Sequence, residues 1–243
     1  MKAKRLLIVF IMLAAFAAAA GAFSFVPMSA SLAPSGAQSI ISFKVTNDTA
    51  QSIAVVIKVM TRSMDIDGKE TNAEVGKDFV IFPTRVVVQP NSSQTVKVQY
   101  KGAPNLAREQ SYRVIAEQVP IDFTKQETSG VKVLFRYIAA LYVTPPKVTA
   151  KLVIGQAVGA EKDGKKGVAI TLKNDGSRHA LMSAAVIKLQ ETASSMPVVL
   201  QGEATSAFEG QNMLSGLSRA FFVPWDAAVI GAQYTGTFDA EIE

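Results

Sequence analysis

Residues 131–146 read VKVLFRYIAALYVTPP, and this stretch decides the fold because it alternates like a strand yet is apolar on both faces. One face carries Val131, Val133, Phe135, Tyr137 and Ala139, and the other carries Leu134, Ile138, Ala140 and Tyr142. Only Lys132 and Arg136 interrupt the second face. A strand with one face in a sandwich core and the other in water shows polar residues on its wet face. We therefore expect the second apolar face to contact something other than water.

The rest of the chain consists of short strand-like runs separated by turn residues. Alternating or β-branched runs occur at residues 40–45, 53–60, 79–82, 86–88, 94–100 and 112–119. Such runs, punctuated by Asn, Asp, Gly and Pro, predict an antiparallel sandwich. After Pro145 and Pro146 the pattern restarts at 148–154 and 167–172. Because consecutive prolines cannot continue a ladder, we predict an all-β chain of two tandem sandwich domains, residues 23–145 and 146–243.

The first 22 residues have the composition of a secretory signal peptide. They combine a basic start, an apolar run from Leu6, and small residues Ala20 and Ala22 on either side of Gly21. This pattern predicts cleavage before Phe23 and export of the mature chain, and the alternative is an uncleaved membrane anchor. No later segment of the sequence is long and apolar enough to span a bilayer, so we expect no membrane span after cleavage.

Composition excludes several classes of function. The chain has no cysteine, which rules out disulfides, thiolate metal sites and a cysteine nucleophile. Without its first 22 residues the chain carries 22 lysines and arginines against 20 aspartates and glutamates, a formal charge of +2. This small excess makes nucleic acid an improbable partner. The hydrophobic fraction of 49% is enough for a sizeable core.

Catalytic and metal-binding patterns are weak. His179 is the only histidine, and no G-x-S-x-G nucleophile elbow accompanies it. We interpret it as a turn residue at the edge of the second domain that is dispensable for folding. Asp67 and Gly68 predict a hairpin turn, because a calcium loop opening at Asp65 would have Gly76 at the position of its bidentate glutamate. We expect no enzyme, no catalytic residue, no metal and no cofactor.

Three stretches resemble the periplasmic pilus (fimbrial) assembly chaperones of the chaperone–usher pathway. Residues 79–98 read FVIFPTRVVVQPNSSQTVKV, a strand that ends at proline, followed by a Gln-Pro-Asn turn and an alternating strand. Residues 112–120 read YRVIAEQVP and are similar to the next strand of the family, and residues 131–145 stand where its long seventh strand lies. The resemblance covers the first domain and the signal peptide, and it implies two immunoglobulin-like sandwiches set at an angle.

The resemblance also implies a partner and a binding strand. In this family the seventh strand lends alternating apolar side chains to an incomplete pilus subunit, which an outer-membrane usher then receives. Aligning Pro145 with the proline that closes the family strand places Val131, Val133 and Phe135 at the donor positions, with Tyr137 next in the row. The alternative is that these side chains belong to the first domain's own core. An exposed donor strand also predicts self-association in the absence of a partner.

The sequence departs from the family at the groups that bind the subunit's terminal carboxylate. In the same alignment the cleft lysine falls on Ala140 and its partner arginine falls near Ala30, and neither alanine can bind an anion. The arginine and glutamate that bridge the two domains fall on Thr144 and Gln118. Arg136 and Arg113 are candidate carboxylate contacts because a guanidinium grips a carboxylate bidentately. The alternative for both arginines is a solvated strand face.

A second functional interpretation stays open at this stage. The same sandwich architecture can serve a secreted accessory module or a carbohydrate-binding module, since a fold does not define a function. Such a module predicts aromatic residues gathered on an exposed face, and Trp225 is the only tryptophan.

Overall fold

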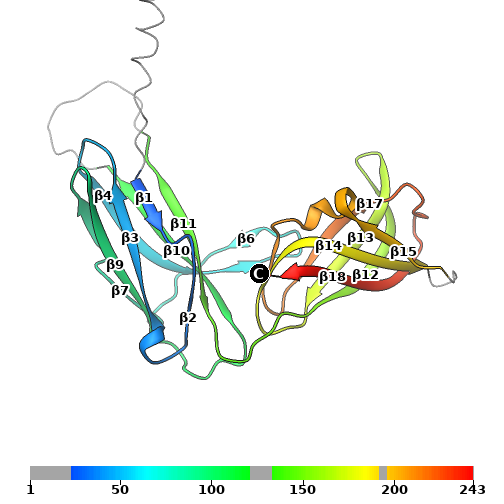
Figure 1. The fold of residues 1–243 in the computed structure, drawn as a ribbon, viewed down its shortest axis with the longest axis horizontal. Helices are drawn as coiled ribbons and strands as arrows, with labels where there is room; N and C mark the ends of the chain where they lie inside the picture. The colour runs from blue at the N-terminus through cyan, green and yellow to red at the C-terminus, as the bar shows by residue number, and fades with distance from the viewer. Residues whose placement is uncertain (1–22, 121–132, 192–195, 243) are drawn as a thin grey trace, which may run out of the picture.

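The computed structural model describes residues 23–120, 133–191 and 196–242. It is an all-β molecule of two sandwiches that lie at an angle to each other (Figure 1). The first sandwich contains β1 (Phe23–Val26), β2 (Ser29–Leu32), β3 (Ile40–Asn47), β4 (Ile53–Thr61), β7 (Phe79–Phe82), β8 (Arg85–Val88), β9 (Ser92–Tyr100), β10 (Gln110–Val119) and β11 (Arg136–Val143). Its two sheets have the strand orders β1-β3-β9-β7 and β2-β11-β10-β4-β8.

The second sandwich is built from the chain after Pro146. It contains β12 (Leu152–Lys162), β13 (Lys165–Asn174), β14 (Ala180–Glu191), β15 (Val198–Gln201), β16 (Asn212–Met213), β17 (Ser218–Pro224) and β18 (Tyr234–Ile242). One sheet has the order β12-β13-β17, and in the other β14 pairs with β15, β16 and β18. A short hairpin of the first domain, β5 (Ser63–Met64) and β6 (Glu70–Thr71), lies between the two sandwiches in Figure 1.

Burial follows the alternation that the sequence shows. In β9 the side chains of Val96 and Val98 are fully buried while Lys97 between them is exposed, because successive side chains of a strand point to opposite faces. The inward-facing residues of the first sandwich form one hydrophobic cluster, and those of the second sandwich form another. The predicted all-β class with two tandem sandwiches is therefore confirmed. The division at residues 145 and 146 stays a prediction.

The hairpin predicted at Asp67 and Gly68 is present, and one strand prediction is partly wrong. Residues 148–154 were expected to form a strand, but β12 begins only at Leu152, where pairing with Asn174 of β13 starts. Just before this point Lys147 has a positive φ of 63°. The Thr149 carbonyl accepts hydrogen bonds from Ser177 and Arg178 instead of from a neighbouring strand. These bonds hold residues 148–151 as a linker. The apolar alternation of the sequence could not reveal this, because the bonds come from residues almost 30 positions away.

Candidate partner-binding strand

The odd-numbered side chains of β11, and of residues 133–135 that precede it, run from the core of the first sandwich out to solvent. Val143, Leu141 and Ala139 are fully buried. Phe135 and Tyr137 are half-buried and pack against the end of the same core. Val133 is 65% exposed although it continues the same row. One face of this segment therefore starts in the core and leaves it.

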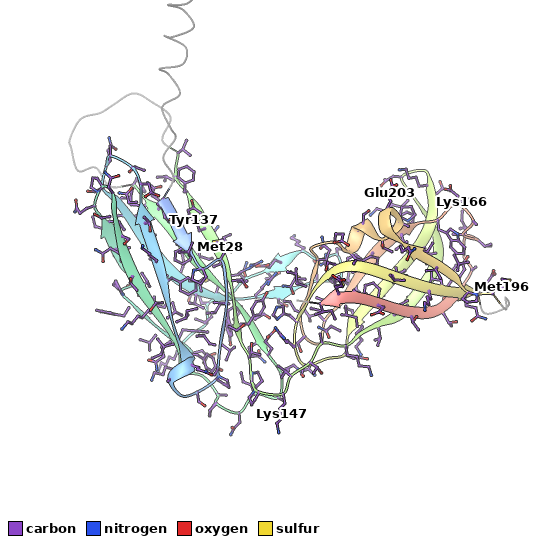
Figure 2. The ribbon with its side chains drawn as sticks, in the orientation of Figure 1. Met28, Tyr137, Lys147, Lys166, Met196 and Glu203 are labelled. Atoms are coloured by element: carbon purple, nitrogen blue, oxygen red, sulfur yellow. The ribbon has the colours of Figure 1, made fainter. Side chains whose placement is uncertain are left out.

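Tyr137 shows how the end of the core is closed. Its hydroxyl donates a hydrogen bond to the Phe23 carbonyl, and its ring packs edge-on against the Phe23 ring at 4.7 Å (Tyr137 is labelled in Figure 2). Phe135 is tied to β10, because Gln118 donates its backbone N–H to the Phe135 carbonyl at 2.9 Å. Tyr137 and Phe135 thus contact their own domain, whereas Val133 is open. Val131, the first predicted donor residue, lies outside the described residues.

One edge of β11 is only partly paired. β10 runs along the whole of β11, but on the opposite edge β2 pairs only with Ala140–Val143. Ala140 and Thr144 donate backbone N–H groups to β2 and its flank, so even-numbered residues direct their backbone groups to this edge. Within the described residues no strand pairs there with Arg136 or Ile138. An edge with unpaired N–H and C=O groups is a template for another strand.

The second face of β11 lies partly against the second domain. Tyr142 on this face is 3% exposed, and its ring stacks on the His179 ring at 3.8 Å. Leu134 and Ile138, farther toward the N-terminal end of the strand, are 48% and 41% exposed. The contact with the second domain therefore buries the Tyr142 end of the second apolar face. The end with Leu134 and Ile138 stays exposed, where the edge of β11 is unpaired.

Arg113 lies next to the position of the missing lysine but is already paired. It is the register partner of Ala140 across β10 and β11. Its Nε and Nη2 atoms bind the two carboxylate oxygens of Glu70 at 2.7 Å and 2.5 Å, and Arg62 binds the same carboxylate at 2.9 Å. Burial acts to raise the pKa of Glu70, but the hydrogen bonds and charges of the two arginines outweigh it and lower that pKa below its usual value.

Arg136, the other candidate carboxylate contact, is exposed at the start of β11. Its register partner is Glu117, whose pKa is lowered by the hydrogen bond and charge of Lys58 and, to a smaller extent, by the charge of Arg136. The two predicted arginine contacts are therefore differently placed. Arg113 lies beside Ala140 and Arg136 lies at the open edge, so their role toward a carboxylate stays a prediction.

The interface between the domains corrects the interpretation of His179. This residue is 8% exposed rather than a dispensable turn residue. Its Nδ1 atom lies 2.6 Å from Oε1 of Glu109, and its backbone N–H donates to the same oxygen at 3.0 Å. Thr144 donates its hydroxyl to the other oxygen of Glu109 at 2.8 Å. Burial acts to raise the pKa of Glu109, but the hydrogen bonds and charge of His179 and the hydroxyl of Thr144 lower it overall.

Sequence reasoning missed this interface because its members are far apart in the chain. Glu109 lies in the loop before β10, and His179 directly precedes β14. Tyr142 completes the contact, since its hydroxyl oxygen accepts hydrogen bonds from Asn212 at 2.8 Å and from Arg62 at 3.1 Å. Only Tyr142 lies near the predicted domain boundary, and nothing in the sequence connects it to Glu109 or His179.

Two further findings concern the described part of the chain. In residues 23–120, 133–191 and 196–242, no group of three or more His, Asp or Glu side chains is placed to hold a metal ion. The search of the same residues found no helix with the length and apolarity needed to cross a membrane.

The structure thus shows a pair of sandwiches with one strand edge that is only partly paired in the described residues. The chain belongs to the family described as pili and flagellar-assembly chaperone, PapD N-terminal domain, whose model matches residues 26–149. It is thus a fimbrial assembly chaperone, and the family consists of binding proteins rather than enzymes.

Solved structures agree with this assignment in fold. The class 5 fimbriae chaperone CfaA has a TM-score of 0.58 and 16% sequence identity, over 91% of this chain and 100% of that chain. The CsuC–CsuE complex from the Csu pili of Acinetobacter baumannii gives 0.56 and 17%, over 88% and 97%. The E. coli chaperone DraB gives 0.51 and 15%, over 92% and 97%. None of the curated proteins matches the chain.

Proposed function

We propose that this chaperone holds a pilus subunit by pairing the open edge of β11 with a strand of the subunit, while Val133 and Phe135 enter the subunit's apolar groove. The observation that carries the proposal is the odd-numbered row, which leaves the core at Phe135 and reaches 65% exposure at Val133 beside unpaired backbone. Main-chain hydrogen bonds supply affinity to an exposed edge, and alternate side chains set the register. Val131 and Tyr137 extend the proposed row at its two ends.

Related structures support a subunit as the partner. The CsuC–CsuE structure is described as a chaperone–tip adhesion subunit pre-assembly complex, and another related structure contains the SafA pilin with the SafB chaperone. By analogy, we place this chain in the periplasm after removal of residues 1–22, with transfer of the bound subunit to an outer-membrane usher. The same open edge would allow self-association when no subunit is present.

We further propose that Arg113 contributes to binding the subunit's terminal carboxylate, with Arg136 as a second cation at the edge. Arg113 lies directly across from Ala140. Ala140 is the residue that falls on the position of the family's lysine. Because Glu70 already holds Arg113 bidentately, an incoming carboxylate would share the guanidinium with Glu70 or displace it. Arg113→Met should therefore weaken subunit binding, whereas Arg85→Met, an exposed arginine on β8, should not.

The alternative of an accessory or carbohydrate-binding module has no specific support. Trp225, the residue on which it depended, is half-buried and packs edge-on against Tyr234 at 5.5 Å. It belongs to the side chains packed on the core of the second domain. The single tryptophan therefore serves packing.

Co-purification with a pilin-like subunit tests the proposed strand. Val133→Asp should abolish the complex, because a carboxylate in an apolar groove costs several kcal/mol, on the order of 3–5. The variant should fold normally, since Val133 is exposed in the free protein. Val80→Asp is the matched control, because Val80 is a 49% exposed valine on β7 of the opposite sheet. Loss of binding in both variants, or in neither, would contradict the assignment of the strand.

A further inference from the structure

The two domains are joined by a second contact besides the one at Glu109. We call it the bridging hairpin, residues 63–71, which comprises β5, a five-residue connection and β6. The side chain of Asp65 holds the turn by accepting backbone N–H bonds from Asp67 at 3.1 Å and Lys69 at 2.8 Å. At the tip, the Ile66 carbonyl accepts the backbone N–H of Ala220 in β17 at 2.7 Å. A turn of the first domain thus pairs with a strand of the second (Figure 1).

The tip of the hairpin covers a buried guanidinium. Gly68 has a φ of 81°, and a Cβ at this position would overlap the guanidinium of Arg219. Arg219 is only 9% exposed, and its guanidinium lies over the Phe221 ring at 5.0 Å. Among the described residues its Nε has no hydrogen-bond partner, and its Nη1 reaches the Asn212 carbonyl at 3.5 Å. Within the described residues no carboxylate lies at ion-pair distance from Arg219. Burial and the nearby charge of Arg62 lower the pKa of Arg219, while the charge of Asp65 in the hairpin opposes this shift without outweighing it.

The two contacts between the domains therefore differ in how well their buried polar groups are satisfied. Glu109, whose side chain has no exposed surface, accepts hydrogen bonds from His179 and Thr144 on both oxygens. At the hairpin, by contrast, Nε of Arg219 has no hydrogen-bond partner among the described residues. An unpaired charge or polar atom that is withdrawn from water opposes the closed arrangement. Closing the hairpin thus carries a cost that closing the Glu109 contact does not.

We infer that the bridging hairpin is a detachable clamp, which opens while the Glu109–His179 contact holds the domains together and serves as the hinge. Lifting the tip returns the Arg219 guanidinium to water and breaks one backbone hydrogen bond, from Ala220 to Ile66. The clamp is linked to the binding strand at its other end. Glu70 in β6 holds Arg113, and Arg113 is the register partner of Ala140 in β11. The inference rests on these contacts and does not depend on the proposed mode of subunit binding.

Amide hydrogen exchange tests the clamp on two single N–H groups, both of which bridge the domains. Ala220 donates to Ile66 under the hairpin, and Glu109 donates to Ser177 at the hinge, at 2.7 Å and 2.8 Å. In the native protein the protection factor of Ala220 should be lower than that of Glu109 by about tenfold or more, as expected for a local opening. Equal protection of the two amides would overturn the inference.

Two variants sharpen the comparison. Gly68→Ala should lower the protection of Ala220 by about tenfold, since a Cβ at this position overlaps the Arg219 guanidinium only while the hairpin is closed. Gly76→Ala is the matched control, because Gly76 has a φ of 60° but open space around its Cβ position, and it should leave Ala220 unchanged. Glu109 should be unaffected in both variants. A drop at Glu109 together with Ala220 would mean that the interface opens as one unit.

Arg219→Met tests the cause assigned to the opening. Removing the buried charge while keeping the length of the side chain should raise the protection of Ala220, because the closed hairpin no longer buries an unpaired guanidinium. If Ala220 exchanges faster in this variant, Arg219 stabilises the closed hairpin and the explanation fails. The wild-type comparison of Ala220 with Glu109 remains decisive even if one variant does not fold.

Discussion

Replacement of His179 by alanine should destabilise the protein strongly, although sequence reasoning alone had treated the residue as dispensable. The change removes the 2.6 Å contact between Nδ1 and the Glu109 carboxylate, whose side chain has no exposed surface. Removing one partner of a buried charged pair costs about 3–5 kcal/mol. The lower end applies here, because Glu109 keeps the backbone N–H of residue 179 and the hydroxyl of Thr144.

Loss of ring stacking adds to this cost. The His179 ring lies parallel to the Tyr142 ring at 3.8 Å with an interplanar angle of 4°. Stacked aromatic pairs contribute about 0.5–1.5 kcal/mol beyond the area they bury. The total for His179→Ala is then about 3.5–4.5 kcal/mol, which corresponds to a fall in Tm of roughly 7–18 °C for a chain of this size.

Scanning calorimetry is the assay, because loss of the interface can also separate the unfolding of the two domains into distinct transitions. Lys173→Ala is a suitable control, since Lys173 forms an exposed ion pair with Asp175 at 2.7 Å and its loss should leave the Tm unchanged. A His179→Ala protein that melts within about 2 °C of the wild type would refute the reasoning, since a buried carboxylate that loses one of its partners must lower stability.

Two more predictions concern the carboxylates of the interface. Because the pKa of Glu109 is lowered in the folded protein, its contribution is present above the unfolded pKa of about 4.3 and is lost as the pH falls through the folded pKa. The free energy of unfolding, measured with urea between pH 3 and 7, should fall steeply only at the acid end. Glu109→Gln should make this fall less steep, and an equal fall with pH in the wild type and the variant would contradict the prediction. Glu70→Gln should reduce the free energy of unfolding by about 1–3 kcal/mol, as it leaves Arg62 and Arg113 without their shared carboxylate. Glu117→Gln is the control, because Glu117 forms an exposed ion pair with Lys58, and it should leave the free energy of unfolding measured with urea unchanged.

The strands of the first domain could be predicted because their signal is local. Val96 and Val98 alternate with exposed residues, and each strand carries its own period-two pattern, so the sandwich follows from the sequence alone. The segment from Arg136 to Val143 is a strand for the same reason, although the sequence predicted that it would begin earlier. Its gradient of exposure could not be predicted, because it depends on where β1 and β2 end beside it.

Contacts between distant segments were beyond sequence reasoning. Glu109 and His179 are separated by 70 positions, and neither lies in a motif. Gly68 and Asp67 signalled a turn, but nothing in the sequence shows that this turn reaches Arg219 of the other domain. Arg113 was singled out as a carboxylate contact, yet its pairing with Glu70 depends on the path of the hairpin. Such pairings arise from the three-dimensional arrangement rather than from spacing along the chain.

Amide exchange at the open edge of β11 tests the central claim most directly, without any substitution. The backbone N–H groups of Arg136 and Ile138 face the edge that no described strand pairs with in the free protein. If a subunit adds a strand there, both amides should become protected in the complex, while the amides of Tyr137 and Ala139, which face β10, should change little. A stable complex in which Arg136 and Ile138 exchange as fast as in the free chaperone would contradict the account.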